Sequence, residues 1–218
     1  MSQTKADYED DVAYDESLDE LPTDEELETT VSNLEERGFD VVVVDSEDEA
    51  LDEVVSRIPE GVSVMNGHST TLEEIGFVEH LSAGDHDWED LHDHVADADD
   101  DAERARRRRE AQAADYFLGS VNAIAQTGEL VAADASGSRV GAYPFAAGNL
   151  LLVSGANKVV ADLEAARDRV RDVVYPLEDA RAQDAYGVGS VVGKEFVYHH
   201  EATEGRTTLV LVRDRLGY

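Results

Sequence analysis

Three short polar segments carry the residue types that could do chemistry in this chain, and each adjoins an apolar run. The first, NGHSTT at residues 66–71, follows the apolar stretch 62–65. Glycine and small hydroxyl side chains at the carboxyl end of a parallel strand suit an anion, because backbone N–H groups converge there with the start of the next helix. An ordinary helix cap by Thr70 or Thr71 accounts for the same residues. The spacing differs from that of the GxxxxGKS/T nucleotide-binding loop.

The second segment, SVNAIAQTGE at residues 120–129, places Asn122, Thr127 and Glu129 among small apolar side chains at the start of a predicted strand. This placement is typical of a pocket wall, in which Glu129 could act as a base or a nucleophile. The alternative is an ordinary strand-opening turn whose glutamate faces solvent. The residues alone leave both interpretations open.

The third candidate combines Ser138-Arg139 with Asn157-Lys158, which follows the apolar run 149–155. An arginine can bind a carboxylate or phosphate through two hydrogen bonds, and a lysine can bind it as a point charge. The alternative is that both cations pair with some of the many acidic residues. Lysine is scarce here, since only Lys5, Lys158 and Lys194 are lysines, and this scarcity favours a role for Lys158.

The overall charge restricts what the protein can bind. Among its 218 residues, 50 are acidic and 18 are basic, for a formal net charge of −32. Such a surface repels phosphate backbones, so nucleic acid is not an expected partner. The arginine run at residues 104–109 lies between acidic stretches and is interpreted as a solvated helix face. An acidic, lysine-poor composition predicts a protein adapted to the high-salt cytoplasm of a halophile.

Several classes of site are absent from the sequence. The chain has no cysteine, which excludes disulfides, thiolate nucleophiles and cysteine-ligated metal clusters. His86, His92 and His94 lie in an acidic stretch and are interpreted as solvated side chains, so no metal site is predicted. No cofactor is predicted either, because a GxGxxG motif is lacking. Without a membrane-length apolar run or a signal-peptide core, a cytoplasmic location is expected.

The elements that must position these residues alternate between strand and helix, which predicts one α/β domain over residues 23–218. An acidic, poorly apolar stretch at residues 1–22 is predicted to be a mobile tail. A capping box at residues 23–26 opens the first helix, and the run FDVVVVD at 39–45 predicts a strand buried on both faces. Near the C-terminus, strands at residues 196–200 and 207–214 are predicted to pair as a hairpin.

Taken together, these segments resemble the lactate-utilisation (LUD) domain family. The resemblance runs from about residue 30 to the C-terminus and is carried by NGHSTTLEEIG, ADYFLGSVNAIAQTGELVAADASGSRVGA, LLVSGANKVVADLEAARDRV and LVLVRDRLGY, in that order. It implies the fold shared by ribose-phosphate isomerase, glucosamine-phosphate deaminase and CoA transferases. That fold is a three-layer, Rossmann-like α/β arrangement with a parallel or mixed sheet and a ligand cleft formed by the loops described above.

The resemblance also implies which residues contact the ligand. By position, the binding set is Gly67, Ser69, Thr70, Asn122, Thr127, Gly128, Arg139, Asn157 and Lys158, with Glu129 as the catalytic candidate. Two departures from the family pattern stand out. Ser138 replaces an asparagine, and AYGVGSVVGKEF at residues 185–196 replaces a cysteine cluster that many relatives carry. Any redox or metal role that depends on those thiols is therefore lost.

Two functions follow as expectations. The first is a non-redox component of lactate-to-pyruvate oxidation, which binds a small organic acid and works with iron–sulfur partner proteins. The second is a free-standing enzyme of the sugar-phosphate isomerase or CoA-transferase type, in which Glu129 is the base or nucleophile. A ligand-sensing scaffold would use the same cleft without a base. In each case the expected ligand is a small anion, either an organic acid or a phosphorylated compound.

Overall fold

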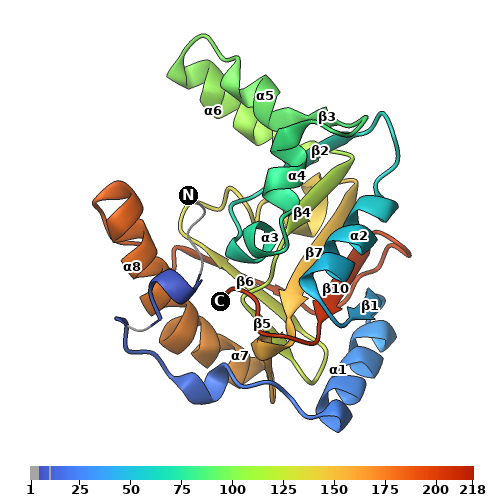
Figure 1. Cartoon of the computed structure of the whole chain (residues 1–218), viewed down its shortest axis with the longest axis vertical. Helices are drawn as coiled ribbons and strands as arrows, with labels where there is room; N and C mark the ends of the chain where they lie inside the picture. Colours follow the sequence, from blue (N-terminus) through green and yellow to red (C-terminus); the bar gives the residue numbers. More distant parts are fainter. Residues whose placement is uncertain (1–4, 10) are drawn as a thin grey trace.

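The computed structural model describes residues 5–9 and 11–218, and a six-stranded parallel sheet forms its centre (Figure 1). The strand order is β1-β10-β7-β4-β2-β3, and every neighbouring pair is parallel. The strands are β1 (Asp40–Val44), β10 (Thr207–Val212), β7 (Asn149–Gly155), β4 (Tyr116–Gly119), β2 (Ser63–Asn66) and β3 (Glu89–Asp90). Because all six run the same way, the loops that follow β2, β4, β7 and β10 emerge at one edge of the sheet.

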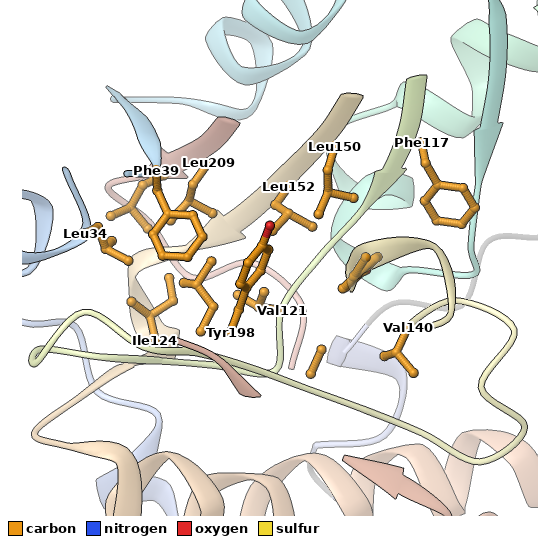
Figure 2. Packing of buried hydrophobic residues seen from close by; sticks show 14 of the residues in the cluster. Leu34, Phe39, Phe117, Val121, Ile124, Val140, Leu150, Leu152, Tyr198 and Leu209 are labelled. Carbon is orange, nitrogen blue, oxygen red and sulfur yellow. The ribbon is translucent and has the colours of Figure 1, made fainter. Parts of the chain in front are cut away.

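A second sheet of four short strands packs against the first. Its order is β8-β5-β6-β9, with β8 (Val159–Val160), β5 (Ala123–Ala125), β6 (Leu130–Asp134) and β9 (Lys194–Tyr198). Figure 2 shows the core between the sheets, where Phe39, Leu150 and Leu209 face side chains of the small sheet. Within this core the rings of Phe39 and Tyr198 meet edge to face, with centroids 4.9 Å apart. The small sheet thus supplies the cover that a parallel sheet requires on this face.

Helices cover the remaining faces. The helices are α1 (Asp24–Glu36), α2 (Glu47–Arg57), α3 (Thr70–Glu74), α4 (Phe77–Ala83), α5 (Leu91–Ala96), α6 (Asp101–Glu110), α7 (Leu163–Arg169) and α8 (Tyr175–Tyr186). Ala50 and Val54 of α2 pack with Val153 and Val210 on the other face of the large sheet. Ala166 of α7 packs against the outer face of the small sheet. The α/β, Rossmann-like class predicted from the sequence is confirmed. No helix in the described part of the chain is long and apolar enough to cross a membrane.

The predicted helix boundaries near the N-terminus agree closely with the structure. Thr23 caps α1, and its hydroxyl and backbone exchange hydrogen bonds with Glu26 in a capping box. Ser46 caps α2, with its hydroxyl accepting from the backbone N–H of Glu49. These signals are local in sequence, and the structure uses them as expected.

Two strand predictions were wrong, one in its burial and the other in its pairing. Residues 40–44 form a strand, but β1 lies at the edge of the sheet and its residues are half-buried or exposed. The two closing strands also form, yet they do not pair with each other. Strand β9 pairs antiparallel with β6, whereas β10 pairs parallel with β1 and β7. The segment between them therefore crosses from one sheet to the other instead of making a hairpin.

The described part of the N-terminal segment packs against the body of the protein, and the mobility predicted for residues 1–22 stays a prediction. Residues 1–4 and 10 lie outside the described residues, but residues 11–22 run along α7 and α8 (Figure 1). Lys5 and Asp19 are buried, and Leu18 packs onto the hydrophobic cluster beneath α7. Buried ion pairs, described below, hold the segment in place although its composition is poorly apolar.

Candidate functional site

A cavity of about 310 Å³ opens at the carboxyl edge of the large sheet. Its walls come from the loop after β2, the turn after β4, the turn after β6, helix α8 and the C-terminal residue Tyr218. The polar lining side chains on which the following argument depends are Ser69, Thr70, Thr71, Ser120, Asn122 and Arg139. Segments distant in sequence meet here because the parallel strands end side by side.

The loop after β2 is anchored by Ser69, which caps the short helix α3. The Ser69 hydroxyl accepts from the backbone N–H of Leu72 at 3.3 Å. Thr70 and Thr71 are the first two residues of the helix, and both are buried. The capping role that the sequence suggested for a threonine therefore belongs to the preceding serine. Both threonines remain among the residues that line the cavity.

Arg139 enters the cavity from the turn after β6. Its guanidinium donates to the carbonyl oxygen of Ala133 at 2.6 Å, to the Asn122 Oδ1 at 3.2 Å and to the carbonyl oxygen of Ser120 at 3.5 Å. All three acceptors are uncharged. Among the described residues no carboxylate forms a direct ion pair with the Arg139 guanidinium, although the Asp134 charge acts on it, so its hydrogen-bonding edge can still receive an anion.

Asp134 fixes the backbone of Arg139 and interacts with its charge, but it forms no direct ion pair with the guanidinium. The carboxylate accepts the backbone N–H groups of Gly137 and Arg139, each at 2.9 Å. Burial alone would raise the pKa of Asp134, but these backbone hydrogen bonds and the Arg139 charge outweigh burial and lower the pKa below its usual value. Asp134 is therefore ionised at neutral pH and fixes the turn that carries the arginine.

Lys158 lies directly beneath the cavity floor. It is fully buried, and its Nζ is 2.9 Å from the Thr71 Oγ1 and 3.0 Å from the Ser120 Oγ. Burial lowers the pKa of Lys158 well below its usual value, and the nearby Arg169 charge lowers it further. Lys158 is not among the residues that line the cavity. It contacts the hydroxyl groups of two residues that do.

The remaining predicted residues lie elsewhere. Asn157 faces the N- and C-terminal segments, with its Nδ2 2.9 Å from the Asp19 Oδ1 and its Oδ1 accepting from the backbone N–H of Leu216. Glu129 pairs with Arg37 at 2.9 Å and accepts from the Thr127 hydroxyl at 2.5 Å. Thr127, Gly128 and Glu129 are not among the cavity-lining residues. The structure therefore brings the loop after β2, Asn122 and Arg139 together, and the catalytic role of Glu129 stays a prediction.

One wall of the cavity has no counterpart in the sequence analysis. Glu178 and Arg181 of α8 form an ion pair with an N–O distance of 2.8 Å, and the Tyr218 hydroxyl donates to Glu178 at 2.9 Å. Burial would raise the pKa of Glu178, but its hydrogen bond with Arg181 outweighs burial and lowers the pKa. Helical spacing within α8 could have suggested the ion pair, but no local signal indicates that Tyr218 meets it. Across residues 5–9 and 11–218, no three His, Asp or Glu side chains gather as metal ligands would.

Comparison with known proteins agrees with this architecture. The LUD domain family profile matches residues 27–192, which covers most of the chain. A solved structure with a similar fold is the crystal structure, at 1.70 Å resolution, of a DUF162 family protein from Deinococcus radiodurans. It superposes with a TM-score of 0.53 at 14% sequence identity, over 88% of this chain and 99% of the other. No curated protein matches the sequence. The extent of the profile match shows that the chain belongs to the LUD domain family.

Proposed function

We propose that this protein binds a small organic anion in the cavity, as a non-redox component of lactate utilisation. The LUD family supports a role related to lactate utilisation at the level of the family. The ligand class that fits best is a 2-hydroxy or 2-oxo carboxylate. Such an acid offers a carboxylate for Arg139 and a neighbouring oxygen for the hydroxyl groups of the wall.

The observation that carries the proposal is the charge of Arg139. In a chain of net charge −32, an anion approaching the surface is generally repelled. Arg139 is half-buried, lines the cavity and has only neutral hydrogen-bond acceptors in the described structure. A partly buried cation without a direct ion pair gains more from a bound anion than an exposed cation does, because the cavity screens the attraction less than open solvent.

The absence of cysteine supports a non-redox role. Iron–sulfur clusters are held mainly by cysteine thiolates, and this chain has none. Electrons removed from a bound lactate would then pass to a partner that carries such clusters. We include iron–sulfur partner proteins in the proposal because the family resemblance implies them, and the lack of cysteine is consistent with that.

Ligand-dependent unfolding in molar KCl tests the proposal. A ligand at 100 times its dissociation constant stabilises the folded state by about 2.7 kcal/mol. We expect lactate, pyruvate or glycolate to raise the midpoint of thermal unfolding, and the Arg139→Ala variant to lose most of the increase.

The matched control is Arg57→Ala, which removes a cation that pairs with Glu53 on helix α2, away from the cavity lining. This variant should respond to the acids as the unmodified protein does. If Arg139→Ala stays folded and keeps the full response, the site assignment is wrong. If none of the acids raises the midpoint in the unmodified protein, the ligand class is wrong.

A further inference from the structure

The hydroxyl of Ser120 has an unusual neighbour for a residue in a cavity wall. Ser120 follows β4 directly, is 2% exposed and lines the cavity. Its backbone carbonyl accepts a hydrogen bond from the Tyr143 hydroxyl at 2.9 Å. Its Oγ accepts a hydrogen bond from the Lys158 amine at 3.0 Å, and the hydroxyl is within donating distance of the Thr71 Oγ1 at 3.3 Å and of the Val121 carbonyl oxygen at 3.2 Å. A hydroxyl nucleophile and a nitrogen base are therefore within hydrogen-bonding distance at the end of a parallel strand.

The lysine is held in this arrangement from several sides. Thr71 supplies a second hydroxyl at 2.9 Å from Nζ, and no described carboxylate forms an ion pair with the amine. The charges that act on it from neighbouring elements are those of Arg169, Glu74, Arg139 and Asp19. Burial has the largest effect and, with Arg169, lowers the pKa of Lys158 well below its usual value. An uncharged amine can accept the proton of a serine hydroxyl, whereas an ammonium group cannot.

We propose that Ser120 and Lys158 form a nucleophile–base pair that accepts an acyl group from an ester or thioester of a small organic acid. The geometry meets the usual requirements for an activated nucleophile, namely a base in hydrogen-bonding distance that is oriented by a third group, here Thr71. This activity goes beyond the proposed binding function. It rests on that function only in using the same cavity, beside Arg139.

Acylation and deacylation of Ser120 follow one another. The Ser120 Oγ attacks the carbonyl carbon and forms the new C–O bond, while its proton passes to the Lys158 Nζ. The bond between the carbonyl carbon and the leaving oxygen or sulfur then breaks, and the alcohol or thiol leaves with the proton from Lys158. Water next attacks the acyl-serine, which regenerates Ser120 and releases the free acid.

Acylation by p-nitrophenyl acetate tests the proposal on the full chain in molar KCl. Release of p-nitrophenolate reports the first step, and peptide mass spectrometry locates the acetyl group. We expect a burst close to one equivalent with acetylation at Ser120. Ser120→Ala should abolish the burst, and Lys158→Met should slow acylation by about 100-fold or more, the usual contribution of a general base.

The control is Ser82→Ala, because Ser82 is an exposed serine of α4 that does not line the cavity. This variant should be acylated at the unmodified rate. Acetyl groups only on other residues would overturn the proposal, and so would an unchanged rate in a folded Lys158→Met variant. If Lys158→Met does not fold, peptide mapping of the unmodified protein still decides. Because the ester is neutral, this test can fail while anion binding through Arg139 holds, and the reverse is equally observable.

Discussion

At the scale of single residues, Asp19 takes part in more ion pairs than any other described residue outside the cavity. Lys5, Arg169 and Arg215 all pair with its carboxylate, and Asn157 donates a further hydrogen bond at 2.9 Å. Burial would raise the pKa of Asp19, but Arg169 and Lys5 outweigh that effect and lower the pKa below its usual value. One carboxylate thus compensates the charge of a fully buried arginine and connects the N-terminal segment to the residue beside Lys158.

We predict that Asp19→Asn lowers the free energy of unfolding by about 3–5 kcal/mol, because it leaves the buried Arg169 without its counter-charge. Denaturant unfolding in molar KCl measures the loss. Asp24→Asn is the control, since Asp24 pairs with Arg213 but its side chain is 92% exposed, and its effect should be small. If both substitutions lowered the free energy of unfolding by the same amount, the Asp19 contacts would contribute no more than an exposed ion pair.

The pH dependence follows from the same carboxylate. Its folded pKa is lowered, so its contribution is fully present above the unfolded pKa of about 3.9 and is lost as the pH falls through the folded value. We predict that the difference in unfolding free energy between the unmodified protein and Asp19→Asn is constant near neutral pH and shrinks below about pH 4. Unfolding curves at a series of pH values measure it. A difference that persists unchanged in strong acid would contradict the assignment.

At the scale of elements, the loop between β2 and α3 sets the position of Arg139. A Cβ atom on Gly67 would lie 2.6 Å from the Arg139 Cγ, closer than side chains pack. Glycine at this position therefore lets the arginine lie against the loop, with its guanidinium beside Ser120. The loop and the turn after β6 act as one unit, although more than 60 residues separate them along the chain.

We predict that Gly67→Ala weakens anion binding by about 10-fold or more, because small displacements of a positioning group are costly. Titration of the acids into the variant measures the change. Gly84→Ala is the control. Gly84 has a positive φ of 72°, so alanine there strains the backbone, but the residue ends α4 and has no neighbour within 4 Å. That variant should lose stability and keep its affinity. If Gly67→Ala kept its affinity for the acids and Gly84→Ala lost it, Gly67 would have no role in positioning Arg139.

Comparing the predicted helices and strands with the observed ones shows which parts of the structure the sequence could predict. Local signals, such as the capping boxes and the apolar runs before residues 66–71 and 156–158, identified elements correctly. The family resemblance implied that these loops gather in one cleft, and the loop after β2 does lie near Lys158. Pairing partners were harder to predict. The run 40–44 is rich in β-branched residues like a central strand, yet it forms an edge, since burial depends on neighbours that the run itself does not specify.

Long-range charge pairing accounts for the other differences. Asp19 reads as one more acid in an acidic tail, and its partners Arg169 and Arg215 lie about 150 and 200 positions away. Nothing near Asp19 in the sequence indicates that it is buried. The sequence around Glu129 suggested a pocket wall. Its partner Arg37 lies before strand β1, far from Glu129 in the sequence, so only the fold reveals the ion pair.

At the scale of the whole molecule, charge is distributed unevenly between surface and interior. Several buried or half-buried cations pair with acids, as Arg181 does with Glu178 and Arg206 with Glu201. Most acids have no cation to pair with, since 50 acidic residues face only 18 basic ones. The surplus acids repel one another, and this repulsion opposes the compact state. Salt weakens the repulsion because the screening length falls from roughly 10 Å at 0.1 M to about 3 Å at 1 M.

We therefore predict that the protein loses compact structure at low ionic strength and regains it in molar KCl, as followed by near-UV circular dichroism. Replacing the exposed acids Glu28, Glu35 and Glu36 of α1 with glutamine should shift the midpoint of this transition to lower salt, because three repelling charges are removed from one surface. Lys194, which is exposed on β9, provides the converse variant: Lys194→Gln adds to the net negative charge and should shift the midpoint to higher salt. Screened repulsion requires the two midpoints to move in opposite directions. If stability instead stays flat from dilute buffer to molar salt, the surplus negative charge does not limit folding, and the halophilic interpretation of the composition fails with it.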